Sequence, residues 1–195
     1  MRPHLPLPLL SALLACFISP SWAAYTLTGN GETTISFADD QYTITPPAGD
    51  PVTQADSPGD IYLTDITESG TYEDGYNRVL NLEGGIYTKL QLWNVAGTAG
   101  GVTLGGTNSF VINIGAGTSL LNTNPQLMGW SNQDRIVAAD ITLNVDQNAG
   151  TINGFCLVGD GNKTDAFQTT GTYIVNIHGG NGSELRLARL APGGA

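Results

Sequence analysis

The sequence predicts an all-β protein, specifically a parallel β-solenoid of the right-handed β-helix kind, in which successive coils of the chain stack on one another. Three observations predict it: a composition rich in turn and strand residues, a repeat of about 31 residues, and alternating apolar and polar positions within each repeat. An antiparallel β-sandwich is the alternative, because regularly spaced turn signals also occur in that fold. No segment has the pattern of a long amphipathic helix.

The composition is poor in charge and strongly acidic. Charged residues make up 12% of the chain, against about 25% in typical domains, and lysine occurs only at Lys89 and Lys163. The formal net charge is −10, and it becomes about −11 if the N-terminal leader is removed with Arg2. Since no cluster of basic residues is present to meet phosphates, nucleic acid is not expected as a partner.

Residues 1–24 have the layout of a secretory signal peptide. Arg2 precedes an apolar run over residues 5–18, and small residues stand at the cleavage positions around Ala23 and Ala24. The run is too short to span a bilayer, and no later segment approaches about 20 consecutive apolar residues. We therefore expect an extracytoplasmic protein, secreted or at the cell surface or outer membrane, with no transmembrane span in the mature chain. Residues 13–16 also look like a lipobox, so acylation of Cys16 is the alternative to cleavage near Ala24.

The chain has two cysteines, so at most one intramolecular disulfide is possible. If Cys16 leaves with the signal, Cys156 is the one remaining thiol, and it lies in an apolar run. We interpret it as a small buried side chain. A reactive thiol would need an activating base, and His178 is the only histidine of the mature chain.

Residues 25–59 are predicted to form an acidic N-terminal cap. Ten acidic residues and no lysine or arginine occur between Tyr25 and Asn77, and short alternating runs indicate strands. Four prolines predict a long loop over residues 46–59. Like charges on a terminal strand resist edge-to-edge aggregation, so capping is favoured over a specific cation site.

Residues 60–190 form the predicted solenoid repeat, marked by four asparagines spaced by about 32 residues: Asn81, Asn113, Asn144 and Asn176. The positions three before, one before and one after each asparagine share one face of a strand, and this face is apolar except at Arg78. Stacked in register, these strands would bury a continuous apolar column. The asparagines would then point outward, where they could stack as a ladder, bond to adjacent turns or merely mark a solvent face. Glycine turns and two further short strands complete each period, and residues 191–195 are expected to be a disordered tail.

No catalytic, cofactor-binding or metal-binding residue is assigned. Five aspartates of the repeat region, with no local acidic pair, are the candidates for polysaccharide chemistry: Asp134, Asp140, Asp146, Asp160 and Asp165. The basic candidates are scattered: Arg78, Lys89, Arg135 and Lys163. We therefore expect a non-enzymatic protein without a cofactor.

Two segments partly match calcium loops. Residues 160–165 place oxygen side chains at alternating positions, but Asp165 stands where an EF-hand needs glycine. Residues 179–184 resemble a single calcium-binding nonapeptide, and such ions bridge adjacent copies. Both segments are interpreted as polar turns.

Four aromatic residues are candidates for sugar-binding platforms: Tyr76, Tyr87, Trp93 and Trp130. Core packing is the favoured interpretation.

The signal peptide, the acidic Gly/Thr/Asn-rich composition and the asparagine-marked repeat together resemble the passenger regions of bacterial autotransporters and related β-helical surface adhesins. The resemblance covers residues 76–190 and rests on pattern. It implies adhesion or scaffolding, with a protein or glycan surface as the unidentified ligand. A secreted carbohydrate-binding module and a polysaccharide-acting enzyme are the alternatives. The chain departs from the family in lacking a C-terminal membrane domain, which implies a fragment or a free secreted relative. The sequence does not settle the oligomeric state.

Overall fold

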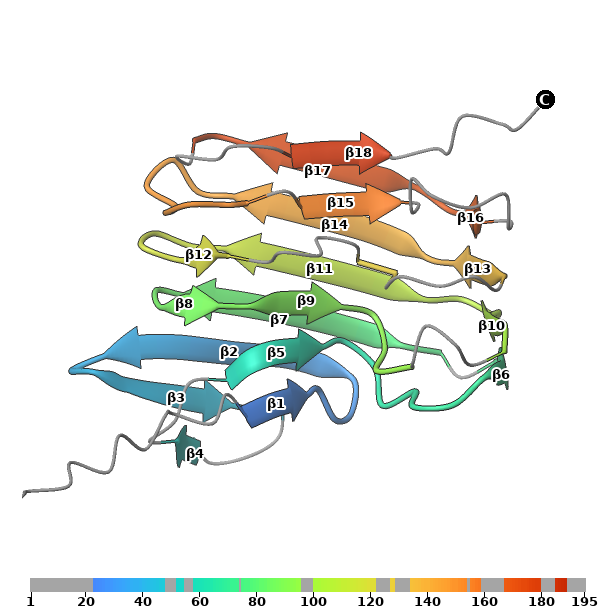
Figure 1. Cartoon of the computed structure of the whole chain (residues 1–195), viewed down its shortest axis with the longest axis horizontal. Helices are drawn as coiled ribbons and strands as arrows, with labels where there is room; N and C mark the ends of the chain where they lie inside the picture. The colour runs from blue at the N-terminus through green and yellow to red at the C-terminus, as the bar shows by residue number, and fades with distance from the viewer. Residues whose placement is uncertain are drawn as a thin grey trace, which may run out of the picture.

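The chain folds as a parallel β-solenoid of about 4 turns (Figure 1). The computed structural model describes residues 23–47, 52–54, 58–73, 75–95, 100–121, 127–128, 134–153, 155–158, 167–179 and 185–188. Within these residues every regular element is a β-strand, and no helix is present that is long and apolar enough to cross a membrane. The predicted fold class is confirmed, and the sandwich alternative is excluded because the repeat strands pair in parallel.

The strands follow one another along the chain. They are β1 (Ala23–Thr26), β2 (Gly31–Ala38), β3 (Gln41–Thr45), β4 (Val52–Gln54), β5 (Pro58–Tyr62), β6 (Gly70–Tyr72), β7 (Asn77–Glu83), β8 (Ile86–Tyr87), β9 (Lys89–Gln91), β10 (Val102–Leu104), β11 (Ser109–Ile114), β12 (Ser119–Leu120), β13 (Arg135–Ala138), β14 (Asp140–Val145), β15 (Phe155–Val158), β16 (Phe167–Thr170), β17 (Tyr173–Ile177) and β18 (Leu185–Ala188).

Each coil contributes strands to three faces. The long sheet has the order β17-β14-β11-β7-β2-β3-β4, and the second sheet has the order β16-β13-β10-β6. The third face consists of three shorter sheets, β1-β5-β9, β8-β12 and β15-β18. The prediction of three short strands in each period is confirmed. Neighbouring strands are parallel everywhere except in the β2-β3 and β3-β4 pairs.

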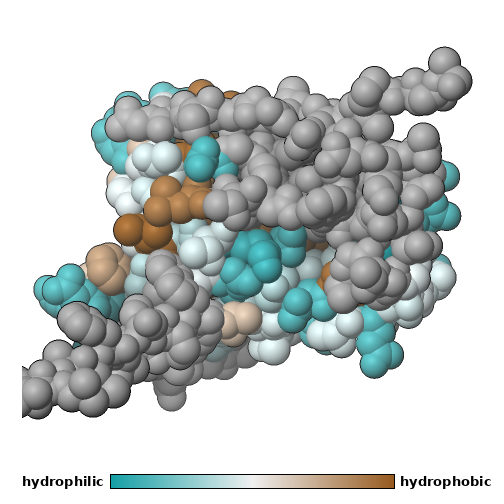
Figure 2. Space-filling view, viewed as in Figure 1, coloured by the Kyte–Doolittle hydropathy of each residue, from teal (hydrophilic) through white to brown (hydrophobic). Residues whose placement is uncertain are grey.

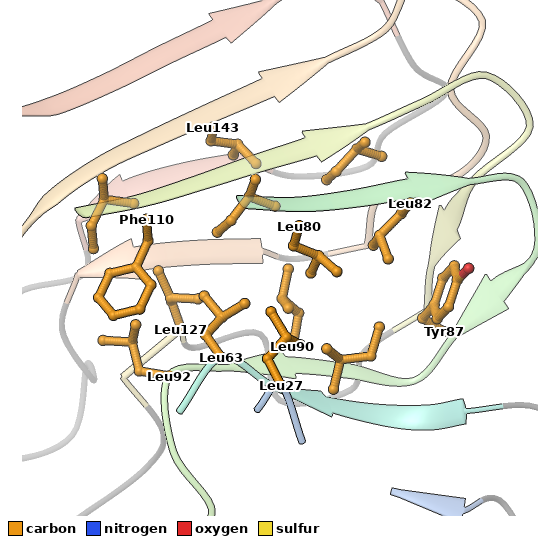
Figure 3. Close-up of a cluster of buried hydrophobic side chains, with 14 of the residues drawn as sticks. Leu27, Leu63, Leu80, Leu82, Tyr87, Leu90, Leu92, Phe110, Leu127 and Leu143 are labelled. Carbon is orange, nitrogen blue, oxygen red and sulfur yellow. The ribbon is translucent and has the colours of Figure 1, made fainter. Parts of the chain in front are cut away.

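The core is the predicted apolar column. In the long sheet Leu82, Ile114 and Val145 lie in register, one coil above another, and each is at most 1% exposed. Parallel rows of buried side chains lie beside this row, and Figure 3 shows them converging with residues of the other faces, such as Leu63 and Leu90. Burial of each such side chain contributes about 1.5–3 kcal/mol, which explains why a unit that cannot close a core alone is stable when stacked.

Arg78, the exception in the apolar pattern, points inward and is only 5% exposed. Its Nη1 donates to the carbonyl oxygens of Leu27 at 2.5 Å and of Leu63 at 2.7 Å. Its guanidinium carbon lies 4.7 Å from the centre of the Tyr76 ring, and its Nη2 lies 3.6 Å from a carboxylate oxygen of Asp65. The buried charge therefore links the first coils by satisfying carbonyls that would otherwise lack donors.

An antiparallel hairpin forms the N-terminal end of the long sheet. The two residues between β2 and β3, Asp39 and Asp40, have φ values of 52° and 59°, as tight hairpin turns require. Beyond β3, the predicted loop over residues 46–59 is wrong in part, because it contains β4 and the first residues of β5. Pro58 is the first residue of β5, a position that needs no donor from proline. The predicted boundary at residue 59 thus falls inside a strand.

Candidate interaction surface

The four repeat asparagines form a hydrogen-bonded ladder on the outer face of the long sheet. The side-chain amide of Asn176 donates to the Oδ1 of Asn144 at 2.8 Å, that of Asn144 to Asn113 at 2.6 Å, and that of Asn113 to Asn81 at 2.7 Å. The four residues are in register across β7, β11, β14 and β17. The ladder, one of the three interpretations of the asparagines, is confirmed.

The ladder has one direction and ends on a carboxylate. The amide of Asn81 donates to the Oε1 of Glu32 at 2.5 Å and lies 3.2 Å from the hydroxyl of Thr34, both on β2. Because every amide donates toward β2, the amide dipoles are aligned, and aligned hydrogen bonds strengthen one another. The last donor of the ladder is the amide of Asn81, and a carboxylate such as that of Glu32 accepts a stronger hydrogen bond than a neutral oxygen does.

A second row of side chains runs beside the ladder. Val79, Val111, Thr142 and Ile174 occupy equivalent positions in successive coils. All four are β-branched, which suits a flat pleated surface with strands about 4.8 Å apart. The outer face of the long sheet is therefore a regular array of alternating amide and branched side chains, and we call these two rows the ladder face.

Two small hollows lie in the described surface. One of about 240 Å³ lies at the edge of the ladder face, lined in part by Asn144, Asp146 and His178. Another, of about 190 Å³, lies at a corner and is lined in part by Asn108 and Asp140. Both are below the range of about 300–1,000 Å³ usual for small-molecule sites.

A polar cluster occupies the outside of the third face, on β5 and β9. The Nζ of Lys89 lies 2.7 Å from the Oδ2 of Asp60 and 3.3 Å from the hydroxyl oxygen of Tyr62. The hydroxyl of Thr88 donates to the other Asp60 oxygen at 2.8 Å. Sequence analysis did not pair these residues, because Asp60 and Lys89 belong to successive coils.

The electrostatics of this cluster favour a fixed ion pair. Burial would raise the pKa of Asp60, but hydrogen bonds from Lys89 and Thr88 and the lysine charge outweigh it and lower that pKa. Burial would lower the pKa of Lys89, but the hydrogen bond to Asp60 and further contacts with Asp60 and Tyr62 raise it. Both shifts hold the groups in their charged states, which is opposite to what a carboxylic acid or an amine base needs for proton transfer near neutral pH.

The second buried arginine, Arg135, is 1% exposed on β13. Its Nη1 donates to the carbonyl oxygen of Gly100 at 3.0 Å, and its guanidinium carbon lies 5.9 Å from the centre of the Trp93 ring. Burial lowers the pKa of Arg135. Its Nε and Nη2 have no hydrogen-bond partner among the described residues. Of the basic candidates, Arg78 and Arg135 are thus core residues, Lys89 is ion-paired, and Lys163 lies outside the described residues.

The candidate aspartates within the described residues serve turns and corners. Asp140 accepts a hydrogen bond from the backbone N–H of Thr172 at 2.7 Å, and Asp146 accepts one from Asn148 at 2.7 Å. Asp134, Asp140 and Asp146 are all exposed. Asp160 and Asp165, with the residues between them, lie outside the described residues. The part of the chain that is described contains no group of three or more His, Cys, Asp or Glu side chains placed to hold a metal ion.

Three of the four candidate aromatic platforms are core residues, as favoured. Tyr76, Tyr87 and Trp93 are at most 6% exposed, and Trp130 is outside the described residues. An apolar patch without aromatic rings lies elsewhere, over β8 and β12 (Figure 2), where Ile86 and Leu121 are 45% and 41% exposed.

Two further predictions fall partly or wholly outside the described residues. Cys156 lies in β15, but its side chain is not among those described. Of the second predicted polar turn, residues 179–184, only Gly179 is described.

Sequence analysis missed the polar residues that join the coils at their corners. Asn108, which is 3% exposed, accepts from the N–H of Tyr76 and donates to the carbonyls of Gly105 and Ala138. Thr118, which is fully buried, donates to Leu82 and accepts from Gly84. The sequence signal that could have indicated these corner residues is a polar residue just before or at the start of several strands, such as Asn30, Asn108 and Asp140.

Comparison of the chain with protein-family models, with curated proteins and with solved structures finds no match. The class that the fold defines is a short parallel β-solenoid, and its function is inferred from its own surfaces.

Proposed function

We propose that the chain is an extracytoplasmic, non-enzymatic β-solenoid that acts in adhesion or scaffolding, and that the ladder face is its contact surface. The observation that carries this proposal is the uninterrupted hydrogen-bonded row from Asn176 to Glu32. A row of paired amides cannot rearrange around a small ligand without losing its bonds. It is suited to lie against another extended surface of protein or glycan.

The geometry gives the alternatives less support. A carbohydrate-binding module uses exposed aromatic rings, whereas Phe37, at 37%, is the one ring among the described residues whose exposure exceeds about a third. A polysaccharide-acting enzyme needs a carboxylate poised to transfer protons. The polar cluster on β5 and β9 holds Asp60 instead in its charged state.

The proposed export has a structural consequence at β1. This strand begins at Ala23, and Tyr25 and Thr26 pair with Ile61 and Tyr62 of β5. Cleavage after Ala24 would leave these two pairs, while cleavage before an acylated Cys16 would leave the whole strand. N-terminal sequencing of the protein recovered from the culture medium and from the envelope fraction distinguishes the two: a start near Ala24 or a blocked N-terminus. Recovery of the unprocessed chain from the cytoplasm alone contradicts export.

Binding is tested with the purified mature chain on arrays of extracellular proteins and polysaccharides. Thr142→Glu places a charge in the middle of the ladder face, and Ile86→Glu places one on the apolar patch of a different face. We expect binding to a surface ligand that Thr142→Glu abolishes and Ile86→Glu preserves. Circular dichroism of both variants checks that the fold is kept.

Three outcomes contradict the proposal. Loss of binding in Ile86→Glu with Thr142→Glu unaffected moves the contact to the third face. Release of sugars from an arrayed polysaccharide makes the protein an enzyme. Absence of binding to every arrayed surface removes the adhesive function.

A further inference from the structure

The coil end formed by β16, β17 and β18 is open within the part of the chain that the structure describes. Among the described strands, each of these three has a paired neighbour on one side only. Ile177 occupies the same row of the column as Leu82, Ile114 and Val145, yet it is 53% exposed, while those residues are at most 1% exposed. Ile174, on the other side of the same strand, is 47% exposed. This edge is a strong template for a further strand.

At the opposite end the same apolar row is covered. Ile35, in the same row as Ile177, is fully buried, because β3 and β4 extend the sheet beyond β2 and Ile44 packs there at 1% exposure. Each chain therefore has one open apolar end and one covered end. A head-to-tail arrangement would set an open end against a covered one and leave unlike surfaces in contact.

From this asymmetry we propose that the open end binds the open end of a second copy of the chain, giving a tail-to-tail dimer with twofold symmetry. A twofold axis that is perpendicular to the long sheet and passes between the Val175 residues of the two copies sets the two β17 strands antiparallel. Tyr173 of each copy then lies opposite Ile177 of the other, and Val175 lies opposite its equivalent. All three positions belong to the inward row of β17, so apolar residues meet apolar residues across the join.

The same axis places β16 of one copy opposite β18 of the other on the remaining two faces. The two strands are equal in length, with four residues each. All three faces therefore continue across the join. The assembly stops at two copies, because the contact uses the open end of both.

The charge distribution favours this orientation. Residues 25–77 carry ten carboxylates and no lysine or arginine, whereas residues 167–195 carry one glutamate and two arginines. Tail-to-tail contact places the two acidic ends farthest apart and joins the ends with least repulsion. A head-to-tail chain would instead bring an acidic end into every contact.

Sedimentation equilibrium of the mature chain over a range of concentrations tests the proposal. We expect a monomer–dimer equilibrium whose dissociation constant rises by at least about tenfold in Ile177→Lys. The matched control is Phe37→Lys, which adds the same charge at an exposed apolar position on β2, at the covered end. We expect it to leave the dissociation constant unchanged.

Cross-linking supplies a readout that does not depend on a charge at the edge. In a Cys156→Ala background, Val175→Cys is expected to form a disulfide-linked dimer under mild oxidation, because the axis brings the two equivalent residues together. Phe37→Cys in the same background is not. A wild-type chain that is monomeric at all concentrations overturns the proposal. So do open-ended oligomers and equal sensitivity of both ends, which indicate head-to-tail stacking.

Discussion

Two isoleucines in the same row of the core show how differently the two ends of the stack are built. Ile35 at the N-terminal end is fully buried, and Ile177 at the other end is 53% exposed. Both come from strands of the long sheet with the same alternating pattern. The difference arises from what lies beyond each strand: an antiparallel hairpin covers Ile35, and no described strand pairs with the outer edge of β17. A repeat thus fixes the inside of a solenoid, while its ends depend on segments outside the repeat.

The largest expected effect is on the core at the covered end. Ile35→Ala should lower the free energy of unfolding by about 2–5 kcal/mol, because it leaves a cavity that the hairpin cannot fill. Ile177→Ala, measured at protein concentrations where the chain is monomeric, should cost under about 1 kcal/mol. Urea unfolding of both variants gives the values. Equal losses would mean that the last coil is covered as well as the first.

The buried arginines offer a second comparison. Arg78→Met should lower the free energy of unfolding by about 1–3 kcal/mol, since the carbonyls of Leu27 and Leu63 lose their donor. Arg135→Met should have an effect near zero, because removing two unpartnered nitrogens offsets the lost bonds to Gly100 and Asp134. Thermal unfolding followed by circular dichroism compares them. A larger loss of unfolding free energy for Arg135→Met would show that the guanidinium of Arg135 has better hydrogen bonding than that of Arg78.

The ladder predicts a smaller, graded effect along the stack. Asn113→Ala removes two amide hydrogen bonds and should cost about 1–2 kcal/mol, whereas Asn176→Ala removes one and should cost about half as much. Amide hydrogen exchange should also speed up in β11 and β14 in the first variant and in β17 alone in the second. Equal losses of unfolding free energy in the two variants would contradict the prediction, because the loss would then not depend on the number of ladder hydrogen bonds removed.

The smallest expected effect is the pH dependence of the Lys89–Asp60 pair. The lowered pKa of Asp60 gives stability above its ordinary value of 3.8, which is lost as pH falls through the folded pKa. The raised pKa of Lys89 gives stability below its ordinary value of 10.5, which is lost as pH rises through the folded pKa. The pair should contribute under about 1 kcal/mol between these limits.

Asp60→Asn should therefore flatten the acid limb of a plot of unfolding free energy against pH, while Glu68→Gln, at an exposed carboxylate, should not. A flat acid limb in the wild-type protein would contradict the lowered pKa of Asp60.

Much of the fold was predictable from spacing. The interval of about 32 residues between asparagines sets the coil length, and the apolar residues around Asn113 and Asn144 set which face is inside. The error over residues 46–59 came from the prolines, which mark strand ends and turns alike and hid β4 and the start of β5. The ladder face was only half predicted, because alternation indicates the outward direction of Asn81 and not its hydrogen bond to Glu32.

The sequence by itself determined that this protein is a stack of β coils with an apolar column inside and asparagines outside, because side-chain direction and burial alternate along each strand and the strands recur with a fixed period. Only the tertiary structure decided that Arg135 is buried without full hydrogen bonding, that Lys89 meets Asp60, and that one end is closed while the other is open. These features depend on contacts between residues about one coil apart or on what covers a terminal strand. Neither the contacts between coils nor the covering of a terminal strand can be recognised from the local sequence pattern.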